Sequence, residues 1–167
     1  MDDKKGILTR LKQDFFKGQQ INTDSVRKLK IGDIIYIPLD REDGLILKGK
    51  YNTRKKYVVI IGFTPEGKAV GSLLVNSNID PSKQSKELMD CQYPLSLKNY
   101  PDILEYSSWL DCSDIFEISN TKIINRKSLL KGTLIEEDIE RVMQLLRETD
   151  VFDNVTKRSY GILPPKK

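Results

Sequence analysis

Histidine is absent from this chain, and that absence excludes more chemistry than any other feature of the composition. A histidine-containing catalytic triad, a histidine-ligated zinc site and a histidine acid–base pair are all impossible. The chain has two cysteines, Cys91 and Cys112, and they do not form a C-x-x-C pair. We therefore expect reduced, buried thiols, with any catalysis resting on the remaining polar side chains.

Long apolar runs are also missing. No run approaches the roughly 18 residues that a membrane span requires. The chain starts Met-Asp-Asp-Lys-Lys and continues with mixed charges, unlike the apolar stretch of a signal peptide. We therefore expect a cytoplasmic protein that does not enter a membrane.

The net charge says little about function, whereas the distribution of the charges along the chain says more. A net charge of +4 over 167 residues is only mildly basic and does not by itself predict nucleic-acid binding. However, Glu136, Glu137, Asp138 and Glu140 cluster late in the chain, whereas cations dominate the central part. The length fits one domain, and we expect opposite charges at two places on its surface.

Apolar and β-branched segments bounded by Gly and Pro predict a strand-rich middle. The segments are Ile31–Pro38, Tyr57–Phe63, Lys68–Val75, Tyr93–Leu97 and two pieces within Tyr106–Ile118. Thr64-Pro65-Glu66-Gly67 predicts a turn between the second and third of them. This pattern predicts a mainly β (α+β) fold, a small antiparallel barrel of five to seven strands.

Helices are predicted at both ends of the strand-rich part. Residues Lys4–Phe16 have apolar side chains at helical spacing. A capping box of Thr133 and Glu136 predicts the start of a second helix, which runs to about Thr149. We divide the chain into an N-terminal helical extension (1–30), a barrel domain with its C-terminal helix (31–152) and a loosely ordered basic tail (153–167).

The connection before Tyr57 concentrates positive charge. It contains Lys48, Lys50, Arg54, Lys55 and Lys56, with no acidic residue from Leu45 to Lys56. Clustered cations next to buried strands favour phosphate binding, and Arg54 has the planar fork that matches two phosphate oxygens. Tyr51 is the best candidate for stacking on a base. The alternative is a solvated loop that keeps an edge strand soluble.

The order of these elements resembles the MazF/PemK toxin family. The matching pieces are Gly32–Pro38, Arg54–Lys56 before Tyr57–Ile61, Gly71–Ile79, Leu110–Ile118, and Lys131–Leu134 followed by an acidic-headed amphipathic helix. The resemblance implies an SH3-like barrel and a sequence-selective, metal-independent endoribonuclease that cleaves single-stranded RNA without a cofactor. It also implies a homodimer, and an antitoxin whose disordered acidic segment occupies the cationic groove.

The resemblance also implies roles for individual residues. Arg54 and Lys56 would bind the scissile phosphate, while Ser77 or Asn76 would orient the attacking or departing oxygen. Asp114 or Ser113 would hydrogen-bond a base edge, although an ordinary strand end or turn is the competing interpretation. The remaining RNA contacts would come from Lys48, Lys50, Tyr51 and Lys55.

Two other interpretations stay open. Lys56-Tyr57 stands where the family usually has Arg-Pro, so a non-catalytic barrel module that binds nucleic acid or a protein is the alternative. Asp40, Glu42 and Asp43 have the carboxylates to bind magnesium, but a charged turn is the simpler interpretation.

Overall fold

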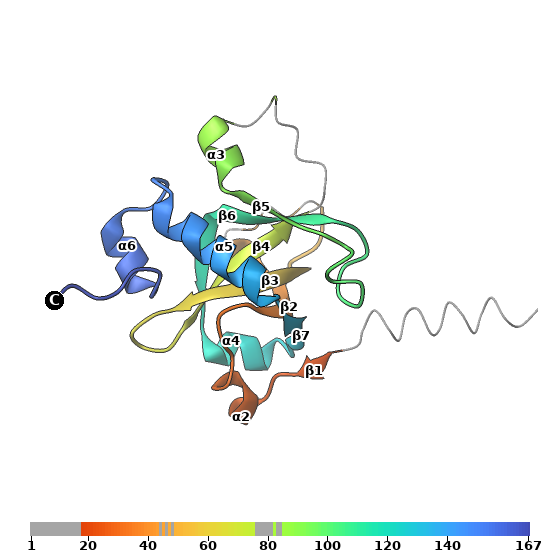
Figure 1. The fold of residues 1–167 in the computed structure, drawn as a ribbon. Coiled ribbons are helices and arrows are strands. Elements are labelled where there is room, and N and C mark those ends of the chain that lie inside the picture. The colour runs from red at the N-terminus through yellow and green to blue at the C-terminus, as the bar shows by residue number, and fades with distance from the viewer. Residues whose placement is uncertain (1–17, 44, 46, 48, 76–81, 83–84) are drawn as a thin grey trace, which may run out of the picture.

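The structure is a computed structural model that describes residues 18–43, 45, 47, 49–75, 82 and 85–167. Its centre is one antiparallel sheet of seven strands in the order β1-β7-β2-β3-β4-β6-β5 (Figure 1). The strands are β1 (Gln19–Gln20), β2 (Asp33–Leu39), β3 (Arg54–Phe63), β4 (Ala69–Val75), β5 (Gln92–Leu95), β6 (Ser108–Ile118) and β7 (Leu129–Thr133). The helices are α2 (Thr23–Val26), the 3₁₀ turn η1 (Arg41–Asp43), α3 (Lys86–Asp90), α4 (Asn120–Asn125), α5 (Glu136–Glu148) and α6 (Asn154–Ser159). The predicted mainly β, barrel-like α+β fold is confirmed.

Two apolar cores lie on opposite faces of the sheet. Alternate residues of β3 separate them: Val59 and Ile61 belong to one core, and Val58 and Ile60 to the other. The first face packs against α5, and we call it the α5 face. The second packs against α2 and α4, and we call it the α4 face (Figure 1). Because side chains alternate along a strand, each polar residue of the sheet can be assigned to one of these faces.

The central hairpin forms where the sequence predicts it. Gly67 has φ +86, a conformation that glycine adopts without strain. The Thr64 N–H donates to the carbonyl of Lys68 at 2.9 Å and closes the turn between β3 and β4. However, β3 begins at Arg54, earlier than the apolar run indicates. The last part of the basic connection is therefore strand, and its side chains alternate between the two faces.

The C-terminal helix is confirmed, but its predicted cap is wrong. Val142, Met143 and Leu146 are buried against the sheet. Thr133 is the last residue of β7, and its hydroxyl donates to Asp33 Oδ1 at 2.7 Å. Ile135 is the N-cap residue and provides no side-chain hydrogen bond. Thr133 therefore belongs to the strand β7 and does not cap the helix, contrary to the capping-box pattern.

Two other local predictions need correction. β6 is one strand of 11 residues rather than two pieces, because a bulge opposite Ser72 and Leu73 lets it continue. The tail is ordered rather than loose: the ammonium group of buried Lys157 donates to the carbonyls of Arg147 and Thr149 at 2.8 and 2.5 Å. It thereby caps the C-terminal end of α5.

Part of the N-terminal extension joins the sheet. β1 pairs with β7, and Asn22 caps α2 by accepting from the N–H groups of Asp24 and Ser25. Asn22 is therefore the N-cap residue of α2. The helix predicted over Lys4–Phe16 lies outside the described residues.

Candidate functional site

The first three residues of β3 are cations that alternate between the faces of the sheet. Arg54 lies opposite Leu39 and Lys56 lies opposite Ile37, whereas Lys55 lies opposite Pro38. Directly opposed residues point to the same face. Arg54 and Lys56 are thus together on the α4 face, and Lys55 is on the α5 face.

The α4 face changes from buried to accessible along β3. Val58 and Ile60 are fully buried under α2 and α4, Lys56 is half-buried, and Arg54 is exposed. The two cations therefore lie where the apolar covering of this face ends.

The two cations are close enough to affect each other's charge. Burial, followed by the positive charge of Arg54, lowers the pKa of the Lys56 ammonium group. Neither residue forms an ion pair with any of the residues that the structure describes. An anion bound beside both side chains would relieve the repulsion between them.

The acidic turn beside them is neutralised internally. Asp40 and Asp43 accept hydrogen bonds from Arg126 at 2.7 and 2.8 Å, and Asp43 also pairs with Lys122. Arg126 donates further to the carbonyl of Pro38 at 2.7 Å. Burial raises the pKa of Asp43, but hydrogen bonds from Lys122, the Asp40 backbone and Arg126 outweigh it and lower the pKa to about 2.

This network bears on the alternative interpretation, in which Asp40, Glu42 and Asp43 bind magnesium. Two of the three carboxylates considered for a metal, Asp40 and Asp43, already face cations of α4 and its C-cap. No group of three or more His, Cys, Asp or Glu residues suited to a metal occurs in the described ranges. Asp40 and Asp43 therefore form a charged turn that ion pairs tie to α4 and its C-cap.

Lys50 and Tyr51 line a hollow on the same connection. It has a volume of about 410 Å³. Its lining residues are Asp40, Arg41, Glu42, Gly49, Lys50, Tyr51 and Asn52. The side chain of Tyr51 is 75% exposed. An exposed ring beside a lysine is available for stacking, but the fold alone does not require it.

β6 adds polar and aromatic side chains to the α4 face. Val58, Leu73 and Asp111 lie opposite one another on β3, β4 and β6, which places Asp111 on this face together with Trp109 two residues earlier. β3 and β6 are separated by one strand, so their backbones lie about 10 Å apart. The register of β3, β4 and β6 therefore places Trp109 on the same face as Arg54 and Lys56.

Asp111 is held by its neighbours. Its Oδ1 accepts from Gln92 Nε2 at 2.8 Å, from the Ser113 N–H at 3.1 Å and from Ser113 Oγ at 2.5 Å. Its backbone carbonyl accepts from Ser72 Oγ at 2.5 Å. These bonds fix the start of the β6 bulge.

Asp114 is exposed at the end of that bulge. Desolvation, followed by the charge of Asp111, raises the pKa of Asp114. Its predicted contact with a base edge remains a prediction. Lys48, Asn76 and Ser77 lie outside the described residues, so the meeting of a hydroxyl with the two cations also remains a prediction.

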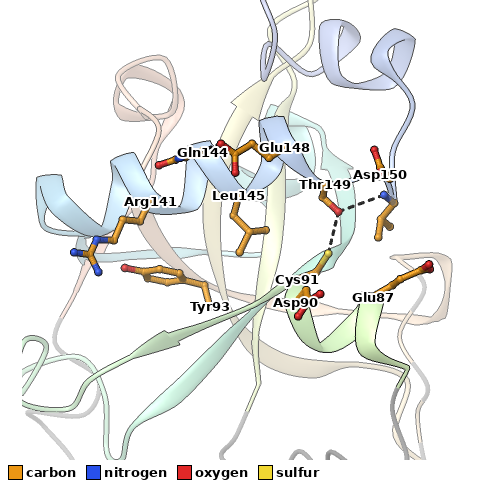
Figure 2. Close-up of a pocket in the computed structure, with 11 residues that line it drawn as sticks. Glu87, Asp90, Cys91, Tyr93, Arg141, Gln144, Leu145, Glu148, Thr149 and Asp150 are labelled. Carbon is orange, nitrogen blue, oxygen red and sulfur yellow. Dashed lines mark hydrogen bonds between the residues drawn. The ribbon is translucent and has the colours of Figure 1, made fainter.

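A larger pocket lies elsewhere, between α3, β5 and α5 (Figure 2). It has a volume of about 660 Å³. Its lining residues are Glu87, Asp90, Cys91, Tyr93, Arg141, Gln144, Leu145, Glu148, Thr149, Asp150 and Val151. Four of these are carboxylates and one is an arginine, so the pocket repels a phosphate backbone. Sequence reasoning missed it, because its walls come from segments about 60 residues apart.

Comparisons with protein-family models and with curated protein sequences gave no match. None of the described helices is long and apolar enough to cross a membrane. The functional argument therefore rests on the geometry of the chain.

Proposed function

We propose that this protein is a metal-independent endoribonuclease of the toxin–antitoxin type, and that its RNA lies along the α4 face. The observation that supports this most is the pair Arg54 and Lys56, on one face of β3 and without a carboxylate partner among the described residues. By contrast, Lys122 and Arg126, the cations that face the acidic turn of this connection, do have such partners. An unneutralised pair at the edge of an apolar core fits a ligand that brings its own negative charge.

The chemistry follows from that pair. Cleavage by the 2′-oxygen of RNA concentrates charge on the phosphoryl oxygens as the bond to the leaving oxygen breaks. Arg54 supplies two parallel N–H donors to those oxygens, and Lys56 supplies a point charge on the same side. A fixed donor of this kind contributes about 10²- to 10³-fold to the rate. Ser77, or Asn76 beside it, is the proposed group that orients the attacking or departing oxygen.

Bases would be contacted on both sides of the phosphate. Trp109 lies on the same face one strand beyond β4, and Tyr51 lies at the preceding connection. Stacking on an aromatic ring contributes about 1–3 kcal/mol per base, and it requires an unpaired strand. Asp114 is the proposed acceptor from a base edge. Lys50 would bind the backbone on the side of Tyr51.

The same cations define the proposed protein partner. An antitoxin segment rich in Asp and Glu would compete with RNA for Arg54 and Lys56, as the family resemblance implies. A homodimer and a cytoplasmic location belong to the same proposal.

A non-catalytic barrel module is the second candidate, and Asp111 favours it. This carboxylate is on the α4 face, but its Oδ1 already accepts three hydrogen bonds from Gln92 and Ser113. A carboxylate committed in this way is a poor general base. If no other group on the face moves a proton, the protein binds RNA without cutting it.

The test is incubation of long single-stranded RNA with the purified protein in EDTA. We expect discrete fragments, and we expect Arg54→Ala/Lys56→Ala to lose at least 10²-fold in cleavage rate. Arg27→Ala/Lys28→Ala is the matched control, because it removes the same charges from exposed positions after α2. Binding without cleavage would favour the non-catalytic module. Equal activity of the two double variants would refute the proposed site.

A further inference from the structure

The chain has two cysteines: Cys91 is the C-cap residue of α3, directly before β5, and Cys112 belongs to the neighbouring strand β6. β5 pairs with β6 through Gln92 and Asp111. One step beyond this pair, the N–H of Cys112 donates to the carbonyl of Cys91 at 2.9 Å. The register therefore brings Cys91 and Cys112 face to face.

Their side chains also point to the same side of the sheet. Cys91 is 2% exposed and Cys112 is fully buried, and both belong to the core of the α5 face. Opposed residues of an antiparallel pair have Cα atoms about 4.5–5.5 Å apart. Disulfides join Cα atoms about 4.4–6.8 Å apart, and the backbone hydrogen bond between Cys112 and Cys91 is compatible with that spacing.

One of the two thiols has a route to solution. Cys91 lines the pocket between α3 and α5, with its Sγ 3.1 Å from Thr149 Oγ1 (Figure 2). Cys112 does not line this pocket, and burial raises the pKa of its thiol to about 12. A reagent that enters the pocket thus meets Cys91 first, while Cys112 stands behind it as the second thiol.

We propose that Cys91 and Cys112 form a reversible intramolecular disulfide, with a low-molecular-weight disulfide as the oxidant that enters this pocket. The Cys91 thiolate attacks one sulfur of the reagent, forms a mixed disulfide and releases one thiolate. The Cys112 sulfur then attacks Cys91 Sγ, the mixed disulfide bond breaks, and the proton of Cys112 passes to the second thiolate as it leaves. Two protein thiols are oxidised, and one reagent disulfide is reduced to two thiols.

The bond would change the structure at a defined place. It would tie the start of β5 to the bulge of β6, and it would take Cys91 Sγ away from Thr149, the C-cap residue of α5. The oxidised protein should therefore differ from the reduced one at the pocket and at the bulge. This inference does not depend on the proposed nuclease function.

The experiment uses the full-length protein and oxidised glutathione. We expect the denatured wild type to fall from two titratable thiols to none, with a mass lower by two hydrogen atoms and no attached glutathione. Reduction with dithiothreitol should restore both thiols. A stable glutathione adduct on the wild type, a covalent dimer, or two thiols that still titrate would each overturn the proposal.

Two variants assign the order of attack. Cys112→Ser should stop at a glutathione adduct on Cys91, whereas Cys91→Ser should keep one unreacted thiol. Thermal unfolding of both variants checks that they are folded, and Cys112→Ala replaces Cys112→Ser if the buried hydroxyl unfolds the protein. Rapid adduct formation on Cys112 in the folded Cys91→Ser protein would contradict the assigned order.

Discussion

Two groups of charges lie on either side of the connection between β2 and β3, and they are used in opposite ways. Asp40 and Asp43 face Arg126 and Lys122, so each charge of this group has an opposite charge beside it. Arg54 and Lys56 lie side by side on one face of β3, and their like charges repel each other. The first group joins distant parts of the chain, since its partners are about 80 residues apart.

This difference separates charges that stabilise the fold from charges available to a ligand. A buried pair keeps its energy only while both partners remain. A pair of like charges does not stabilise the fold and becomes favourable when an anion binds. Removing the first group should therefore cost stability, and removing the second should cost binding.

The largest expected effect is on stability, from Asp43→Asn. The side chain of Asp43 is only 2% exposed, so it is a buried partner of Lys122 and Arg126. The change removes its negative charge from both of them. We expect a loss of about 3 kcal/mol in the free energy of unfolding, or about 6–12 °C in Tm. Urea unfolding followed by circular dichroism measures it.

Glu42→Gln is the control for that variant. Glu42 is an exposed carboxylate in the same turn, and no ion pair links it to another described residue. It should change stability by less than about 0.5 kcal/mol. Equal losses from Asp43→Asn and Glu42→Gln would show that total charge, rather than the network, matters.

Low pH should remove the contribution of Asp43 to the free energy of unfolding. The pKa of Asp43 is about 2 in the folded protein, below its ordinary value of 3.8. Its contribution is thus present above pH about 4 and is lost as the pH falls through about 2. The difference in unfolding free energy between wild type and Asp43→Asn should shrink over that interval, and a difference that stays constant would contradict the assignment.

The next largest effect is expected for Lys56→Met, whose change in stability has the opposite sign. Because burial and Arg54 lower the pKa of Lys56, the charge of Lys56 is less favourable in the folded protein than in the unfolded chain. We expect Lys56→Met to unfold at the same or a slightly higher temperature, while it loses RNA cleavage or binding. Scanning calorimetry and the RNA assay must be run on the same sample. A clear drop in Tm would indicate that Lys56 is a structural residue.

The smallest effect is expected at Lys55. It is exposed and adjacent to Lys56 in sequence, but it points to the α5 face. Lys55→Ala should therefore weaken RNA binding less than Lys56→Ala does. If the two variants weaken binding equally, net charge rather than the α4 face determines affinity.

Much of this architecture could be predicted from local patterns. The apolar run after Lys56 and the turn at Gly67 are local features, and both are confirmed. The role of Thr133 was not predictable, because its hydroxyl bonds Asp33, which is 100 residues away in sequence. The same limit applies to Asp43, whose partners come from α4 and its C-cap.

The candidate site shows a similar division. The basic connection is visible in the sequence, but a predicted loop gives no basis for separating Lys55 from Lys56. That separation requires β3 to begin at Arg54. The position of Trp109 on the same face requires the pairing of β4 with β6. The strand register, which local sequence does not specify, therefore defines the site.

The salt dependence of RNA affinity tests most directly whether Arg54 and Lys56 bind phosphate. For single-stranded RNA, the slope of log affinity against log salt decreases in magnitude by about 0.7 for each lost phosphate contact. We expect Arg54→Ala/Lys56→Ala to have a slope smaller in magnitude by about 1.4 than that of the wild type. The Arg27→Ala/Lys28→Ala control should keep the wild-type slope. An unchanged slope in the Arg54→Ala/Lys56→Ala protein would contradict the account.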